Sequence, residues 1–282
     1  MEPKLWIKLG NGGDDLAEEF EISDKVEGLK FLGLDSNPNP VNQYSANQAQ
    51  DGSGVPLYTT YANNVVTAKF WLAFKDYYDL KLAKHDIARI FAPRTTLRLR
   101  TDAEPGKVQY VKPVPYEVAP AVDGDTNIIF SIPFDNWSGY QYSLYRSDEF
   151  ASHSDAWAMG MNLPKEAMTF TFSTAKFTLF NPSDVAVDPY FKRHDLKIAV
   201  NFSGDSLKLT NTTNSTEWAY TSKASKTDNI VLDGINTTLN GSPASSNTDF
   251  GNLTLEPGNN IIEVTGASDF TVTFSFPFIY LG

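Results

Sequence analysis

The residues best suited to chemistry in this sequence are its three histidines, His85, His153 and His194. They fall in different predicted elements: a helix, a connecting segment and the stretch Phe-Lys-Arg-His-Asp-Leu-Lys. None has a second histidine at the spacing of a metal site, and a serine–histidine–aspartate triad could be assembled on paper from many such residues. The sequence therefore singles out no catalytic residue, and we expect no enzymatic activity.

Oxygen ligands are abundant but form no recognisable site. The chain has 34 Asp and Glu against 23 Lys and Arg, and no pair stands out as the two carboxylates of a glycosidase. Asp123-Gly124-Asp125 resembles half of a calcium loop, but the acidic ligands that should follow, including the glutamate at the twelfth position, are missing. We interpret it as a β-turn and predict no metal and no cofactor.

Composition excludes further classes. Without cysteine there are no disulfides, zinc thiolates or thiol nucleophiles, and no nucleotide-binding loop or Gly-X-Ser-X-Gly elbow occurs. A net charge of −11 repels phosphate backbones, so we expect no nucleic-acid partner. No apolar run approaches the roughly 20 residues of a membrane-spanning helix, so we expect no membrane insertion. The first residues lack a signal-peptide pattern, which predicts synthesis in the cytoplasm.

Three tryptophans leave their roles open. Trp137, Trp157 and Trp218 could be platforms on which sugars stack, anchors of a protein interface, or ordinary core residues.

The sequence predicts one convincing helix, over residues 76–92, within the first half of the chain. Asp76 is placed to cap it and Pro93 to end it. Its apolar residues recur on roughly one side, namely Tyr77, Leu80, Ala83, Ile87, Ile90 and Phe91.

Strands account for most of the remainder. Residues 65–74 alternate strongly, with Val66, Ala68, Phe70, Leu72 and Phe74 on one face. Residues 35–54 are rich in Asn, Pro, Gln, Ser and Gly and nearly free of large apolar side chains, so they are expected to be a long loop. A long hairpin is predicted over 108–132, with prolines at its tip. From residue 168 onward, short alternating runs separated by polar turns are typical of a β-sandwich, with strands expected at 168–172, 176–180, 195–201, 206–210, 217–221, 228–232, 252–255, 261–265 and 270–281.

The final predicted strand is unusually apolar. Alternate positions from Phe270 to Tyr280 are aromatic or aliphatic, whereas Thr271, Thr273 and Ser275 lie between them. Pro277 cannot donate to a ladder, which indicates an edge or a bend there. After Pro277 both faces are apolar, so we expect this end to pack on a neighbouring element or domain.

The order of several stretches resembles the distal tail proteins of siphophages that infect Gram-positive bacteria. The resemblance rests on the order and spacing of "QDGSGVPLYTTY", "VVTAKFWLAF", "IARIFAPRTTLRLRTDAEPGKVQYV", "TFTFSTAKFTLFNPSDVAVDPYF", "LKIAVNFSGDSLKLTNTT" and "LTLEPGNNIIEVTGASDFTVTFSFPFIYLG". It covers most of the chain.

This resemblance implies a mainly β protein of two sandwiches. The first, over 1–150, would carry the helix 76–92 and an extended hairpin and would form a hexameric ring. The second, over 151–282, would be galectin-like, with a linker at about 135–165. The ring would join the tail tube protein to the tail hub and the receptor-binding protein, in the tail tip of the virion.

Two other functions stay open at this point. One is a carbohydrate-binding or adhesin β-sandwich, although the galectin sugar motif is missing and "FNPSD" is only a faint echo of it. The other, more distant, is a glycan-processing enzyme.

We predict that calcium does not bind this protein. Calorimetric titration of metal-stripped protein with calcium should give only heats of dilution, because no stretch supplies the full set of oxygen ligands. Saturable binding at micromolar affinity, or a melting temperature that rises with calcium, would contradict this prediction.

Overall fold

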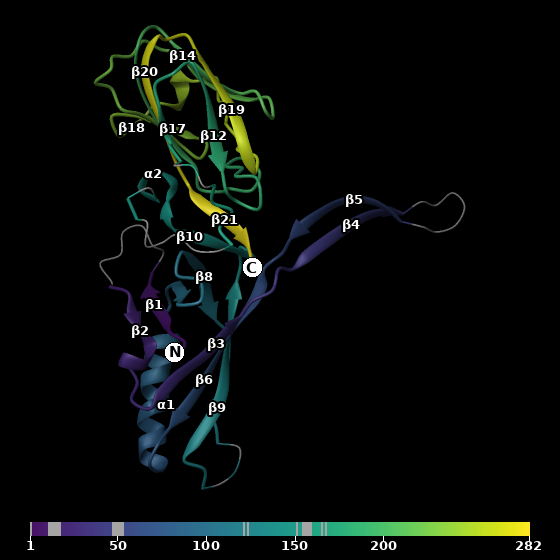
Figure 1. Ribbon diagram of the computed structural model, residues 1–282, viewed down its shortest axis with the longest axis vertical. Helices are drawn as coiled ribbons and strands as arrows, with labels where there is room; N and C mark the ends of the chain where they lie inside the picture. Colours follow the sequence, from purple (N-terminus) through teal and green to yellow (C-terminus); the bar gives the residue numbers. More distant parts are fainter. Residues whose placement is uncertain are drawn as a thin grey trace. The chain divides into compact units, whose positions relative to one another are not determined.

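The computed structural model describes residues 2–10, 18–46, 54–120, 122, 124–150, 152–153, 160–164, 166 and 168–282. The chain divides into two compact units. Unit 1 comprises Met1–Gln141 with Leu281–Gly282, and unit 2 comprises Tyr142–Tyr280. Strands dominate both units (Figure 1), which confirms the mainly β prediction.

Unit 1 is built around one antiparallel sheet. Its strand order is β2 (Phe20–Glu21), β1 (Leu5–Leu9), β7 (Leu97–Thr101), β8 (Lys107–Pro113), β9 (Asn127–Asn136), β6 (Asn64–Ala73) and β3 (Leu29–Asp35). A short 3-10 turn, η1, spans Ile22–Asp24. All five residues predicted to share the buried face of β6 and its end are in the core, namely Val66, Ala68, Phe70, Leu72 and Phe74.

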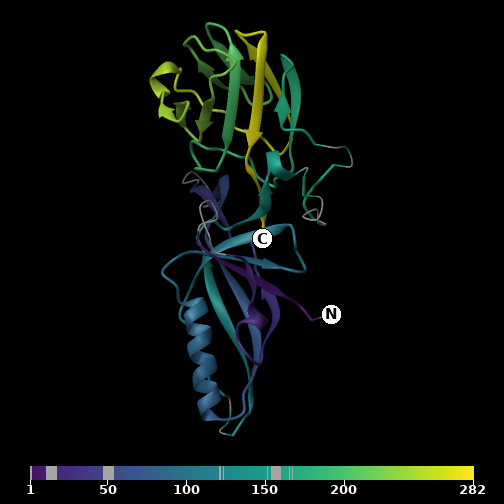
Figure 2. The same cartoon turned by 90° about the vertical axis from the view of Figure 1, so that its left-hand side faces the viewer.

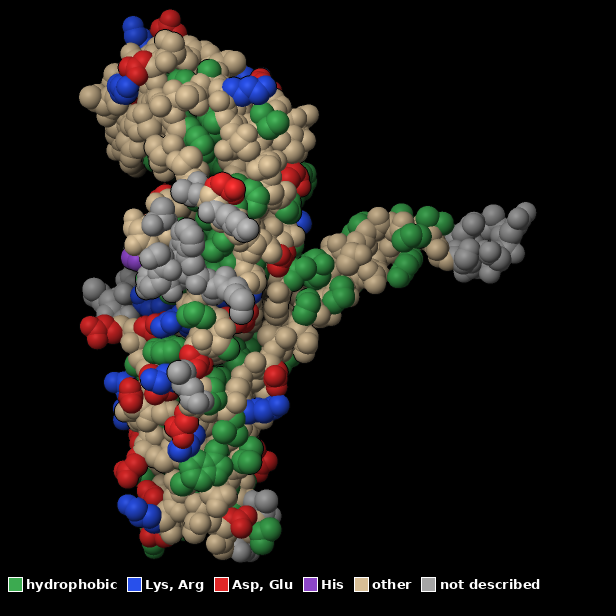
Figure 3. Space-filling model, in the orientation of Figure 1, with side chains coloured by type: hydrophobic (Ala, Val, Ile, Leu, Met, Phe, Trp, Pro, Cys, Tyr) green, Lys and Arg blue, Asp and Glu red, His purple; other side chains and the backbone are tan. Residues whose placement is uncertain are grey.

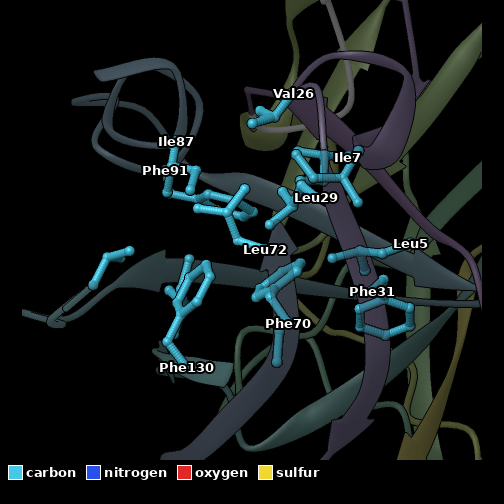
Figure 4. Packing of buried hydrophobic residues seen from close by; sticks show 14 of the residues in the cluster. Leu5, Ile7, Val26, Leu29, Phe31, Phe70, Leu72, Ile87, Phe91 and Phe130 are labelled. Atoms are coloured by element: carbon cyan, nitrogen blue, oxygen red, sulfur yellow. The ribbon is translucent and has the colours of Figure 1, made fainter. Parts of the chain in front are cut away.

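Helix α1 (Tyr77–Phe91) lies along one face of this sheet (Figure 2). Ile87 and Phe91 point from the helix toward Phe70 and Leu72 (Figure 4). The rings of Phe70 and Phe91 are 5.6 Å apart, and Phe130 stacks on Phe70 at 5.5 Å. One sheet face is therefore filled by aromatic packing against the helix.

The predicted helix 76–92 is confirmed. The Asp76 side chain accepts a hydrogen bond from the Asp79 N–H at 2.9 Å, so it is the N-cap. Tyr77 was expected on the apolar side, but it is exposed because it occupies the first helical position, beyond the end of the core.

The hairpin predicted over 108–132 is confirmed only in part, since β8 and β9 are antiparallel neighbours that pair over a short stretch. Strand β9 pairs along its whole length with β6, from Asn64↔Asn136 to Ala73↔Asn127. Strand β8 meets β9 at only two positions, Lys112↔Asp135 and Pro113↔Phe134. The prolines that were assigned to a hairpin tip instead end β8 and lead into an irregular connection.

The extended hairpin of unit 1 lies elsewhere, where the sequence indicated a loop. Strand β4 (Pro40–Ala46) pairs with β5 (Gly54–Tyr61). We call the described residues of these strands, 40–46 and 54–61, the arm. The chain passes from β3 to β4 and from β5 to β6 through short connections, so the arm continues the β3–β6 pair (Figure 1).

Unit 2 contains a β-sandwich. One sheet has the order β11 (Thr171–Phe172), β20 (Asp269–Ser275), β13 (Lys197–Ser203), β16 (Ile230–Asp233), β17 (Asn236–Leu239) and β18 (Ser242–Pro243). The other has the order β12 (Lys176–Asn181), β19 (Gly258–Thr265), β14 (Leu207–Asn211) and β15 (Thr216–Tyr220).

Aromatic rings join the two sheets of the sandwich. Phe172 stacks on Phe177 at 3.9 Å, and Phe202 of one sheet is 6.0 Å from Tyr220 of the other. The strand expected at 252–255 forms only isolated bridges, Glu217↔Asn252 and Val187↔Leu255, whereas β17 and β18 were not predicted. A 3-10 turn, η3, spans Ser245–Asn247.

The segment 135–165 contains regular structure. Strand β10 (Tyr140–Arg146) and the short helix α2 (Ser147–Phe150) lie within it, and β10 pairs with β21 (Pro277–Leu281). Within this segment the Phe150 ring is 5.1 Å from that of Phe278.

The end of the chain follows its predicted pattern. Phe270, Phe274 and the alternate residues between and beyond them are buried, and the strand breaks at Phe276, just before Pro277. In the two-sided apolar end, Phe278, Ile279 and Tyr280 are fully buried. Besides the Phe150 contact, the Tyr280 hydroxyl donates to the Met161 carbonyl at 2.9 Å.

We predict that Phe274→Ala lowers the free energy of unfolding of unit 2 by about 3–5 kcal/mol, because it empties a fully buried aromatic site between the sheets. Hydrogen exchange of unit 2 amides in increasing urea measures the change. Phe250→Ala removes an exposed ring of the same size and should leave exchange nearly unaltered. Equal effects of the two substitutions would contradict the prediction.

Candidate assembly surfaces

The structure does not bring the histidines together into a catalytic group. His85 is exposed on α1 in unit 1. His153 stacks on Tyr145 at 3.8 Å, and His194 is buried in a different loop of unit 2. Across the described ranges, no cluster of three or more His, Asp or Glu side chains could hold a metal ion.

His194 orders a loop instead of facing a substrate. Its Nδ1 lies 3.2 Å from the Asp188 N–H, which donates to it, and 3.1 Å from the Ala186 carbonyl oxygen. Burial, with the charge of Lys192, lowers the pKa of His194. Asp188 in turn accepts hydrogen bonds from the N–H groups of Tyr190 and Phe191, whose rings project from the loop.

The other candidate residues differ in how far they are buried. Trp218 is buried within the sandwich, so for this residue the core interpretation is confirmed. Trp137 is half exposed, and Trp157 lies outside the described residues, as does Asp123. The Asp125 N–H donates to the Val122 carbonyl at 3.2 Å.

The arm is an exposed ribbon without charge. Charged residues make up 20% of the chain, yet β4 and β5 contain none. Large side chains along it are open to solvent, with exposed fractions of 61% for Tyr44, 58% for Leu57 and 62% for Tyr58. Green side chains are spread along the whole described ribbon in Figure 3. An isolated two-stranded hairpin is marginally stable in water, so this surface is suited to being covered.

A second apolar surface lies on the sheet of unit 1, on the face turned away from the core. We call Leu32, Trp71 and Ile129 the outer patch. Ile129 is directly opposite Trp71 in the β6–β9 register, and Leu32 is the bulged residue of β3 beside them. Ile129 is 71% exposed and Leu32 is 45% exposed. Hydrophobic side chains gather over β6 and β9 in Figure 3.

Sequence reasoning missed both surfaces. A strand that is exposed to solvent on both faces shows no alternation of apolar and polar residues. For this reason the sequence of β4 was interpreted as part of a loop. Two features of the arm sequence could have indicated a contact surface, namely its lack of charged residues and its tyrosines. For the outer patch, the available signal was a tryptophan on the face of 65–74 opposite the apolar set.

A family model described as a phage tail protein RIFT-related domain matches residues 18–136. This range includes the arm, α1 and the three strands of the outer patch. The resemblance to siphophage tail proteins is thus confirmed over these residues.

One solved structure extends the likeness in fold to both units. The SPP1 Dit (gp 19.1) protein, described as a paradigm of the hub adsorption apparatus in phages that infect Gram-positive bacteria, is similar with a TM-score of 0.64. It is 12% identical, and the match covers 96% of this chain and 99% of that chain. A chain of the phage p2 baseplate, in its activated conformation with calcium, gives a TM-score of 0.47 at 10% identity, covering 99% and 98% of the two chains. None of the curated proteins compared with the sequence matches it.

In the part of the chain that the structure describes, no helix is long and apolar enough to cross a membrane.

We predict that His194 makes unit 2 less stable in mild acid. Its ordinary pKa is 6.5 and the folded-state pKa is lower, so below pH 6.5 the unfolded chain binds protons that the folded chain does not. The free energy of unfolding should fall as the pH drops from 6.5 toward the folded-state pKa.

Urea unfolding of unit 2 at a series of pH values checks this expectation. His194→Gln should remove this pH-dependent component, whereas His85→Gln, at an exposed position of α1, should keep it. Parallel pH profiles for wild type and His194→Gln would show that the imidazole does not titrate in this way.

Proposed function

We propose that this protein is a structural component of a phage tail tip or baseplate, in which its copies form a hexameric ring. The ring would connect the tail tube protein to the tail hub and to the receptor-binding protein. The match of residues 18–136 to a phage tail domain supports this function, as does the shared fold with the SPP1 Dit protein.

The observation that carries the proposal is the arm. A chain of net charge −11 that exposes an uncharged ribbon with several aromatic and aliphatic side chains is suited to protein contact. Aromatic side chains are also the preferred anchors of interfaces. Since the arm belongs to unit 1, we assign ring formation to that unit.

The virion, at the tail tip, is the corresponding location. A non-enzymatic role agrees with the scattered histidines of the described residues. A galectin-like unit 2 would then serve to contact other tail proteins and not to bind a sugar. Contact area between subunits, on the order of 1,000 Å² or more, is what such a role requires.

We predict that charge on the arm abolishes assembly. Leu57→Arg combined with Tyr58→Arg should convert a particle of about six chains into a monomer, because each buried guanidinium would lack a partner. Light scattering after size exclusion gives the mass. Both side chains are exposed, so the fold should persist.

Leu82→Arg is the matched control. Leu82 is an exposed aliphatic residue of α1, away from the arm, with an exposed fraction of 61%. This variant should assemble like the wild type. A wild-type protein that stays monomeric at high concentration, or an arm variant that keeps the full mass, would refute the proposed role of the arm.

A further inference from the structure

We propose that the outer patch of unit 1 is the receiving surface for the arm of a second copy of this chain. This inference rests on the proposed function, and it names the contact that the ring would use. It concerns Leu32, Trp71 and Ile129 as acceptor, and the arm residues 40–46 and 54–61 as donor.

The outer patch has an apolar centre surrounded by charged residues, as small protein interfaces do. Its apolar centre is bordered by charged residues that already have partners: Lys30 pairs with Glu2 at 2.7 Å, and Lys69 pairs with Asp35 at 2.8 Å. The Lys30 ammonium also lies 5.9 Å from the Trp71 ring centroid. An apolar centre within a polar rim is typical of protein contacts. A ligand that covers it needs no charge of its own.

A chain's own arm points away from its own patch. The arm leaves the sheet at the Asn64 end of β6, whereas Trp71 is seven residues further along the strand, a distance of about 23 Å at the usual rise per residue. Folding back over the patch would require the ribbon to reverse direction at the junction between arm and sheet.

Hydrogen bonds at that junction oppose such a reversal. The Ala62 N–H donates to the Asn39 carbonyl at 2.9 Å, and the Asn39 side chain donates to the Asn63 carbonyl at 2.8 Å. The Asn64 side chain donates to the Asn37 carbonyl at 2.8 Å. Pairing therefore runs through the connections and keeps the arm directed outward, so a chain's own arm does not cover its own patch.

The arm is chemically suited to this surface. It carries no charge that would be buried without a partner, and its exposed Leu57 and Tyr58 can cover Ile129 and Trp71. The contact would join two different surfaces, so each copy donates one arm and accepts another. Such head-to-tail contacts close into a ring when the rotation between neighbours permits it.

A mixing experiment tests the inference. The patch variant, Leu32→Arg with Ile129→Arg, keeps an intact arm, and the arm variant, Leu57→Arg with Tyr58→Arg, keeps an intact patch. All four side chains are exposed, so both variants should fold, which hydrogen exchange of the unit 1 amides verifies. Each variant alone should have the mass of one chain by light scattering.

The equimolar mixture should form a dimer and nothing larger. The arm of the patch variant can enter the patch of the arm variant, but the remaining arm and the remaining patch are both blocked. Leu82→Arg again serves as the control and should assemble like the wild type.

The outcomes separate this inference from the proposed function. Full-size particles of the patch variant, together with a monomeric arm variant, would overturn the inference and leave the arm's role in assembly standing. Two monomeric variants that stay monomeric when mixed would also overturn it, because the arm would then contact some other surface. Full-size particles of both variants would overturn the proposed role of the arm itself.

Discussion

The pairing of β6 with β9 over ten residues is the interaction on which unit 1 depends. Its alternation places Phe70 and Phe130 under α1 and leaves Trp71 and Ile129 on the opposite face. Because the register of a strand cannot slip by one residue without exchanging its faces, the buried core fixes the position of the outer patch. A short connection joins β6 to β5, one of the two strands of the arm. The β6–β9 pairing therefore determines which residues form the core and which form the outer patch, and β6 also connects this sheet to the arm.

The parts of the fold that were predictable are those in which burial imposes a period. Residues 65–74 and 76–92 each have one apolar side, and each forms the element that its period indicates. The prediction of a long hairpin over 108–132 placed β8 and β9 correctly as neighbours but overestimated the length of their pairing, because sequential strands need not be each other's main partners. The principal partner of β9 is β6, which precedes it by more than fifty residues. No pattern within the sequence of β9 indicates that β6 is its main partner.

The candidate assembly surfaces were largely beyond sequence reasoning for a related physical reason. A surface that becomes buried only between copies has no partner within one chain, so it leaves no internal pattern to detect. Residues 40–46 look like a polar loop because both faces of β4 are wet. Ile129 looks like part of an apolar run, Ile128-Ile129-Phe130, in which only the first and third residues are buried. Only the folded structure shows that residues such as Tyr44 and Ile129 are exposed to solvent, and this exposure identifies them as surface residues.

The absence of charge on the arm has a consequence for how copies would meet. Electrostatic attraction accelerates many associations, and salt weakens it. The arm would offer no such attraction, while acidic chains repel one another through their net charge of −11. Dissolved salt screens that repulsion without touching the apolar contact. Ionic strength would therefore favour association through such an arm, the opposite of the salt dependence of contacts between oppositely charged surfaces.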